Sequence, residues 1–429
     1  MIQLRSFKSI FLLPELRNKI LFTLGVLIVD RLGSYIPVPG VDVGKLSDYL
    51  SQASLLGSFF NYLDTFSGAA LGRCTIFALG ISPYITSSIA MQLLSLSFPS
   101  LQALTKEGDY GRKIIDQYTR YLTLGLAVLY STSYALGLQS AGIVLNPGFG
   151  FIISFILTMS AGSMFVMWLG EQISLYGIGN GASMIIFAGI ASRFPGYVFR
   201  TIKAVDMGSI SIFTAFLILA IFLIITCCIV YLEKGERKIP VQYARRVVNN
   251  RVFGTQSSYI PFKINTVGVM PVIFASAMLQ MPMSLINWLS TKYISLAFLA
   301  QWFAFSGFLF NATEFVLIIF FTFVYTTLLF NPDERAEEMK KNGAFIPGVR
   351  PGSSTSRYIE TILNRIGLIG AIYLAALSII PNIMIGFINM PFYLGGTALL
   401  IAVGVALELS NQIESYLLEH KYEGFTAKK

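Results

Sequence analysis

Ten apolar stretches, each long enough to cross a lipid bilayer as a helix, constrain this chain more than any other feature of its sequence. A hydrocarbon core about 30 Å thick needs roughly 20 helical residues. None of the stretches alternates as barrel strands do, and lipid leaves only helices or closed barrels as spanning structures. We therefore expect an all-α, polytopic membrane protein. Its transmembrane helices are predicted at residues 20–37, 73–97, 118–138, 149–170, 180–198, 209–232, 265–289, 308–330, 362–385 and 391–412.

The composition agrees with a chain that lies mostly in lipid. Hydrophobic residues make up 55% of the 429 and charged residues only 12%, whereas soluble domains carry about 25% charged residues. Pro14 and Glu15 interrupt the short N-terminal apolar run, and it lacks a small-residue cleavage site, so we expect a surface amphipathic segment rather than a signal peptide. Cys74, Cys227 and Cys228 fall inside expected spans, where they act as small apolar residues.

Lysine and arginine are distributed unevenly between the two sets of loops. If the N-terminus is cytoplasmic, the opposite face holds only seven of the 31 basic residues. An excess of basic residues marks the cytoplasmic side, so we expect both termini in the cytoplasm. The seven residues on the opposite face are Arg31, Lys45, Arg73, Arg193, Arg200, Lys203 and Lys292.

The expected spans divide into two groups of five, an N-terminal half at residues 1–205 and a C-terminal half at 206–429. Because each half has an odd number of spans, the second is expected to sit inverted relative to the first, as in many transport folds. Between the first two spans, residues 54–74 are rich in small residues and contain Asp64. They suit either a re-entrant half-helix shielded from lipid or an external interfacial helix, and periodicity does not decide between them.

Two long basic loops, residues 231–262 and 331–361, are expected on the cytoplasmic side. They contain Gly/Pro turns, mixed charge and apolar residues such as Ile239, Phe345 and Ile346. These features favour structured docking surfaces for a partner such as ribosomal RNA or an acidic motor protein. Binding of anionic lipid headgroups is the simpler alternative for any single charge.

Residues for catalysis or metal binding are scarce, which argues against an enzyme and against any cofactor or metal. The single histidine, His420, is in the C-terminal tail, and no phosphate-binding loop has the required spacing. The charged residues of the spans, Arg73, Glu171, Glu314 and Glu408, lie near expected span ends, where snorkelling explains them. An ion-coupled small-solute secondary transporter, which would need carboxylates near the midplane, is kept as the alternative.

Seven segments of the chain resemble, in order, the signature segments of the SecY family, the channel subunits of the bacterial Sec protein translocon. The similarity runs from about residue 14 to about residue 415. The segments are RLGSYIPVPGVD (31–42), FSGAALGRCTIFALGISPYITSSIAMQLL (66–94), EGDYGRKIIDQYTRYLT (107–123), WLGEQISLYGIGNGASMIIFAGI (168–190), KINTVGVMPVIFAS (263–276), KKNGAFIPGVRPG (340–352) and PFYLGGTALLIAV (391–403).

The resemblance implies a clamshell of two pseudo-symmetric halves around an hourglass pore. Such a channel has an apolar ring at its waist, a plug helix on the external side and a lateral gate to membrane lipid. It passes unfolded preproteins through the waist and releases signal sequences and transmembrane segments through the gate. The implied partners are SecE, usually SecG, the SecA ATPase and the translating ribosome. The implied location is the bacterial cell inner membrane.

The resemblance also assigns roles to particular residues. The ring positions fall on Ile81, Ile85, Ala182, Ile186, Ile273 and Ile401. Ile81 and Ile85 share a helical face. Ala182 is smaller than the residue usual at that ring position. Three explanations are open: the waist is wider there, Met184 or the plug fills the gap, or Ala182 only packs against its neighbours.

Three further groups are implied. The plug covers about residues 61–72 and includes Asn61, Asp64, Ser67, Gly68 and Gly72. The lateral gate has Gln92, Thr119 and Asn265, which could equally be structural interhelical contacts. Motor or ribosome docking falls on Arg245, Arg246 and Arg350, and a turn-capping or lipid-anchoring role is the alternative for Arg350.

Overall fold

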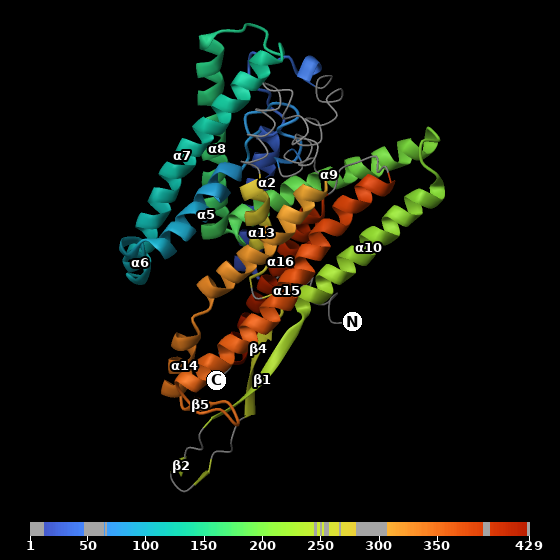
Figure 1. The fold of residues 1–429 in the computed structure, drawn as a ribbon. Coiled ribbons are helices and arrows are strands. Elements are labelled where there is room, and N and C mark those ends of the chain that lie inside the picture. The colour runs from blue at the N-terminus through green and yellow to red at the C-terminus, as the bar shows by residue number, and fades with distance from the viewer. Residues whose placement is uncertain are drawn as a thin grey trace.

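The computed structural model shows a long bundle of helices from which a small β-sheet projects (Figure 1). A helix lies within each of the ten spans predicted from hydropathy, and seven helices in the described part of the chain are long and apolar enough to cross a membrane. The seventh and tenth predicted spans extend into 280–289 and 391–394, which are outside the described residues. The structure describes residues 13–46, 64, 67–243, 247–248, 251–252, 257–265, 267–279, 307–388 and 395–426.

Six helices of eight residues or more lie among the described residues of the first half of the chain. The start of the last one, α9 (Gly181–Asp206), is set locally. Asn180 Oδ1 accepts hydrogen bonds there from the backbone N–H groups of Ala182 and Ser183. Gly181, the first residue of this helix, is packed so closely on the Gly170 carbonyl that only glycine fits. The helices are α2 (Pro14–Gly33), α5 (Ser82–Ser97), α6 (Pro99–Lys106), α7 (Asp109–Ser140), α8 (Phe149–Tyr176) and α9 (Gly181–Asp206).

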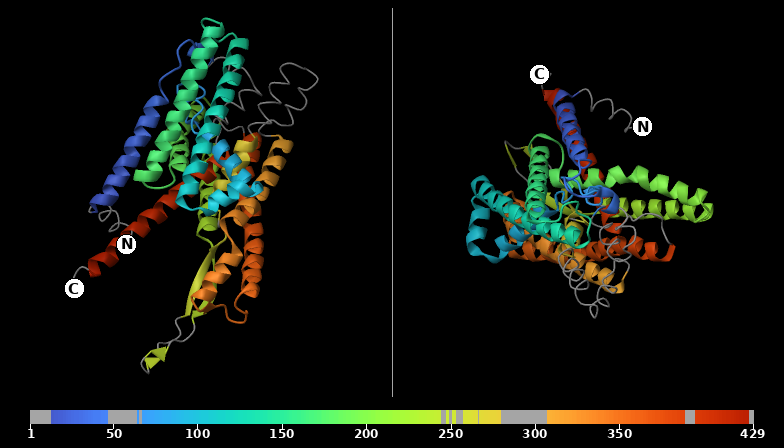
Figure 2. Two further views of the ribbon diagram at one scale, coloured as in Figure 1. Left: turned by 90° about the vertical axis from the view of Figure 1, so that its left-hand side faces the viewer. Right: turned by 90° about the horizontal axis from the view of Figure 1, so that it is seen from above.

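The second half contributes the remaining helices. Its last helix runs back to the first half, where the Lys19 ammonium donates a hydrogen bond of 2.9 Å to the Tyr416 hydroxyl. The blue and red helices in Figure 2 show this pairing of the two ends of the chain. The helices are α10 (Ile212–Lys234), a short helix at Met270–Leu279, α13 (Phe308–Leu329), α14 (Pro332–Lys341), α15 (Ser353–Ile388) and α16 (Gly396–Thr426).

The two long basic loops are structured and meet in one antiparallel sheet with the strand order β4-β1-β5. Ile239 in β1 (Glu236–Tyr243) pairs with Ile260 in β4 (Ser257–Lys263), and Gln242 pairs with Phe345 in β5 (Ala344–Phe345). Ile239 and Ile346 are buried in a cluster with residues of α15, so the sheet has its own apolar core. Beyond it, β2 (Val247–Val248) and β3 (Arg251–Val252) form a hairpin.

The second predicted span begins later than hydropathy indicates. Residues 73–81 were expected to be helical, but they form turns and α5 starts at Ser82. Cys74 and Gly80 have φ angles of 50° and 53°, which a right-handed helix excludes. Thr75 pairs with Pro37 in an isolated bridge, so a contact with the loop that follows α2 holds this segment out of the helix.

The largest apolar cluster joins both halves of the chain. Ile81 and Ile186 from the first half pack in the same cluster as Ile273 and Ile401 from the second. The core of the molecule therefore lies between the halves, where the resemblance places the pore. The two-fold relation between the halves stays a prediction.

Candidate pore and gate

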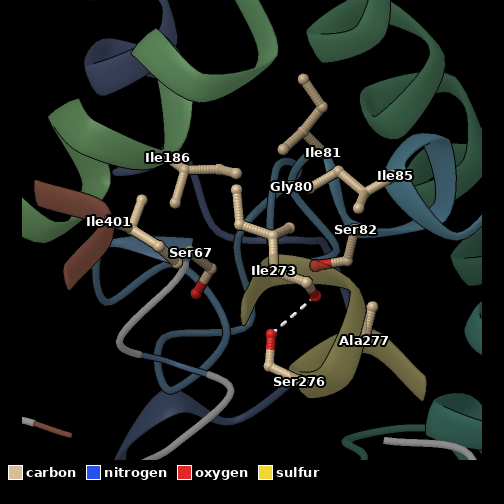
Figure 3. Close-up of a pocket in the computed structure, with 10 residues that line it drawn as sticks. All are labelled: Ser67, Gly80, Ile81, Ser82, Ile85, Ile186, Ile273, Ser276, Ala277 and Ile401. Atoms are coloured by element: carbon tan, nitrogen blue, oxygen red, sulfur yellow. Dashed lines mark hydrogen bonds between the residues drawn. The ribbon is translucent and has the colours of Figure 1, made fainter. Parts of the chain in front are cut away.

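Five of the six predicted ring residues line one cavity (Figure 3). They come from four places in the chain: the start of α5, the second turn of α9, the Met270–Leu279 helix and α16. The cavity holds about 30 Å³, enough for a water or two and far too little for an extended polypeptide. The five residues are Ile81, Ile85, Ile186, Ile273 and Ile401, and all but Ile85 are at most 5% exposed.

Small and polar residues complete the wall of this cavity. Ser67 comes from the predicted plug, and Ser82 and Ser276 follow Ile81 and Ile273 along the chain. The Ser276 hydroxyl donates to the Ile273 carbonyl over 2.8 Å, so its polarity is directed into its own helix. Four further lining residues were not predicted: Gly80, Ser82, Ser276 and Ala277. Their small side chains beside the ring isoleucines indicate close packing, and this is the sequence signal that could have identified them.

Ala182, the sixth predicted ring residue, does not line the cavity. It lies one turn before Ile186 and packs partly buried against the central cluster, beside Gly170 of α8. Met184 is also buried and does not line the cavity either. This arrangement favours the packing alternative for Ala182, and the wider waist and the gap filled by Met184 or the plug stay untested predictions.

The predicted plug residues within the described part of the chain gather around one carboxylate. Asp64 accepts hydrogen bonds from the Gly72 N–H at 2.7 Å and from the Ser67 hydroxyl at 3.4 Å. It also pairs with Arg193 of α9. Residues 64 and 67 are helical, whereas 68–72 form turns, so neither of the two predicted helices, re-entrant or interfacial, extends through 68–72. Asn61 lies outside the described residues.

The three predicted gate residues have separate surroundings. Gln92 donates weakly to Ser88 at 3.4 Å and lies within hydrogen-bonding reach of Tyr325 on α13, in the other half of the chain. The Thr119 hydroxyl donates to the Ile115 carbonyl of its own helix. Asn265 donates to Glu233 at 2.6 Å and to the Gly268 carbonyl at 3.0 Å. Over the described ranges, no hydrogen bond joins these three side chains to one another.

A second cavity, of about 280 Å³, opens beside Asn265. Its wall contains charged groups of both signs: the carboxylates of Glu233 and Glu408 and the ammonium groups of Lys234 and Lys263. Asn180, just before α9, also lines it. It lies between the halves, on the side of the basic loops. No local sequence pattern indicates this grouping, because its members come from four separate segments of the chain.

Glu314 departs from its predicted surroundings. It was expected to snorkel from a span end, but it is only 1% exposed. Its carboxylate accepts hydrogen bonds from the Ser378 hydroxyl at 2.9 Å and the Asn382 amide at 3.2 Å. The buried group therefore belongs to the contact between α13 and α15, where neighbouring polar side chains replace water as its partners.

Arg350 is the one predicted docking residue that falls within the described part of the chain. Arg350 is exposed in the turn between β5 and α15, where Gly348 and Gly352 have positive φ angles of 83° and 106°. Its backbone carbonyl accepts a hydrogen bond of 2.9 Å from the Thr355 hydroxyl. In β1, a hydrogen bond to Glu236 raises the pKa of Lys238, which stays charged. Arg245 and Arg246 are outside the described residues.

Known proteins match this chain over nearly its whole length. The family model described as SecY matches residues 75–410. Protein translocase subunit SecY of Aquifex aeolicus (strain VF5) is 45% identical over 425 residues, covering 97% of this chain and 98% of the relative. The subunit of the same name from Escherichia coli (strain K12) is 42% identical over 417 residues, with 96% and 94% covered.

Solved structures show the same fold. The structure described as "The structure of a protein conducting channel" matches with a TM-score of 0.66 at 18% identity, covering 93% of this chain and 92% of that one. "Sec61 in the Canine ribosome-channel complex from the endoplasmic reticulum" matches with a TM-score of 0.62 at 18% identity and the same coverage. The chain belongs to the SecY family.

Proposed function

We propose that this chain is a protein-conducting channel, which passes unfolded preproteins across a membrane and releases transmembrane segments laterally into lipid. One observation carries the proposal: branched apolar side chains from both halves of the chain meet around a cavity of about 30 Å³. The relatives named as protein translocase subunits support the same function, and they are not enzymes. An ion-coupled transporter of small solutes finds no support among them.

The chemistry of the ring suits a seal that opens for any sequence. Isoleucine side chains offer no hydrogen bonds to water or ions, so a narrow apolar constriction resists wetting when it is empty. A translocating chain meets only dispersion contacts, which do not depend on its sequence. The ring can therefore separate to admit a polypeptide and close again without breaking specific bonds.

The energy for transport must come from outside the chain. We assign the docking of a motor ATPase or a ribosome to the sheet formed by the two basic loops, which carries Lys238 and ends near the exposed Arg350. One structural neighbour is described as a ribosome-channel complex. SecA is the proposed motor, SecE the proposed brace of the two halves and SecG the usual third subunit.

The chain is a multi-pass membrane protein, as its apolar helices and its translocase relatives indicate. We place it in the inner membrane of a bacterial cell with both termini in the cytoplasm, because most basic residues would then face the cytoplasm. Protease protection of tags at each terminus in inside-out vesicles tests this orientation. Protection of either tag contradicts it.

Crosslinking of a stalled preprotein tests the channel itself. A photoreactive side chain is placed at Ile85 or Ile401, and at Phe216 as a control, because Phe216 is 70% exposed on the outer face of α10. In vesicles supplied with the motor and ATP, we expect ATP-dependent adducts at Ile85 and Ile401 and none at Phe216. Import without adducts at the two isoleucines would show that the chain passes elsewhere.

A further inference from the structure

One buried carboxylate connects the proposed plug to the pore-forming helices. Asp64 is 5% exposed. One of its oxygens binds the Gly72 N–H and the Ser67 hydroxyl within the plug, and the other pairs with the Arg193 guanidinium of α9. A single side chain therefore holds the turn at 67–72 together and fixes it to a neighbouring helix.

A second arginine stands beside this pair and is committed to other partners. Arg31 of α2 binds Asp30 at 2.6 Å and reaches the Ser192 hydroxyl at 3.3 Å. Its guanidinium lies against Gly68 of the plug, where a methyl group would collide with it. Asp30 satisfies Arg31, so Arg193 is the cation that balances Asp64.

The pair is shielded from water on both sides. The side chains of Arg193 and Asp64 are 17% and 8% exposed. Separating such ions leaves each partly buried without a partner, which costs more than breaking an exposed pair. The plug cannot move away from α9 without breaking this contact.

The same segment reaches the ring. Ser67 binds Asp64 and lines the small cavity with Ile81, Ile186 and Ile401. Movement of the plug turn therefore changes the wall of the constriction directly. The Leu71 carbonyl, at the other end of the turn, accepts a hydrogen bond from Tyr134 of α7 at 3.1 Å.

We propose that the Arg193–Asp64 ion pair fastens the plug to α9 and so sets how readily this channel opens, and with that its selectivity for signal sequences. The inference rests on the proposed channel function. Loss of the pair should favour the open state, because the ions no longer have to be separated. The selectivity of the channel would then depend on one charge in the plug and one charge in α9.

A double-mutant cycle tests the proposal in the purified translocon. Asp64→Asn keeps an oxygen that can accept from Gly72 but removes the charge, and Arg193→Gln removes the cation. We expect each to raise the resting potassium conductance in planar bilayers about tenfold, as loss of a charge-assisted hydrogen bond implies. The double variant should leak no more than either single variant. Asp42→Asn, which breaks an exposed pair with Lys45, is the control and should leak like the parent.

Preprotein import is measured in the same preparations. We expect ATP-dependent import of a normal preprotein to persist, and import of one with a defective signal sequence to increase in the three variants. Parent-like conductance in either single variant, or additive effects in the double variant, would overturn the ion-pair proposal. Absence of import by the parent protein would instead contradict the channel function, so the two failures are distinguishable.

Discussion

Asn265 donates a hydrogen bond of 2.6 Å from its side-chain amide to the Glu233 carboxylate, which joins the end of α10 to the segment before the Met270–Leu279 helix. Its second amide hydrogen bond goes to the Gly268 carbonyl, and its own oxygen Oδ1 is buried with no hydrogen-bond partner among the described residues. The residue thus fixes the segment that leads to Ile273 of the ring.

Replacing Asn265 by leucine should loosen this segment and shift the channel toward opening. The change removes both hydrogen bonds and leaves the Glu233 carboxylate without its donor, at a cost of about 1–3 kcal/mol. We expect import of preproteins with weakened signal sequences to rise. Asn265→Asp, which retains the size but not the donor, should act in the same direction. Unchanged selectivity in both variants would contradict a gate role.

Ala182→Ile should destabilise the protein without tightening the pore. Ala182 packs beside Gly170 outside the ring cavity, so added methyl groups would overpack the α8–α9 contact by about 1–3 kcal/mol. We expect a lower unfolding temperature in detergent and an unchanged resting ion leak. Ile186→Ala is the comparison, because Ile186 lines the cavity and its truncation should increase the leak. A reduced ion leak in Ala182→Ile would contradict this prediction and show that Ala182 is part of the ring.

Gly181→Ala should impair folding, whereas Gly137→Ala should not. A methyl group on Gly181 would collide with the Gly170 carbonyl, which is backbone and cannot move aside. Gly137 lies inside α7 with open space around it, so alanine there should stabilise the helix by about 0.5–1 kcal/mol. Accumulation in the membrane and unfolding temperature measure both. Equal accumulation of the two variants would show that α8 and α9 do not approach this closely.

The sequence predicts the features of this fold that are local. Apolar length alone locates a helix within every predicted span, and the pattern of basic loops identifies the end that carries the sheet. The start of α5 was predicted too early, because the bridge between Pro37 and Thr75 and the positive φ of Cys74 depend on a contact with another part of the chain. Pairing of β1 with β5, about a hundred residues apart, is equally invisible to local patterns.

The candidate site divides in the same way. The five isoleucines that the resemblance assigned to the ring meet in the structure. They could be identified because members of one family share the same arrangement of helices. The resemblance did not distinguish Ala182, whose role depends on the packing of its neighbours. The burial of Glu314 could not be predicted either, since exposure near a span end depends on which helices cover it. The contact of Asp64 with Arg193 joins a residue of the predicted plug to a residue of α9. The two are 129 positions apart, so no local pattern predicts their contact.

Arg350→Glu should reduce motor-driven translocation more than membrane-protein insertion. The guanidinium is exposed in a turn whose glycines hold it away from the sheet, so reversing its charge should disturb docking rather than folding. Translocation of a secreted preprotein and insertion of a membrane protein are measured in the same vesicles. Arg335→Glu, in an exposed pair with Glu338 on α14, is the matched control. Equal loss of both activities in Arg350→Glu would indicate misfolding.

Glu314→Leu should destabilise the C-terminal half, and Glu314→Gln should be tolerated. Leucine removes the acceptor for the Ser378 hydroxyl and the Asn382 amide, both fully buried, at about 1–3 kcal/mol for the unsatisfied amide. The Ser378 hydroxyl can turn to a carbonyl of its own helix, so Asn382 should carry most of the cost. The carboxylate uses one oxygen for each partner, so glutamine can keep its oxygen toward the Asn382 amide and donate from its NH2 group to the Ser378 hydroxyl, which can also accept.

Unfolding temperature in detergent and preprotein import separate the two possible roles of Glu314. A structural role predicts a lower unfolding temperature for Glu314→Leu only, with import retained by Glu314→Gln. Glu414→Leu on the exposed face of α16 is the control and should behave like the parent protein. Loss of import in Glu314→Gln at normal stability would show instead that the charge itself takes part in transport, because the amide preserves the size of the carboxylate and can keep a hydrogen bond to each partner.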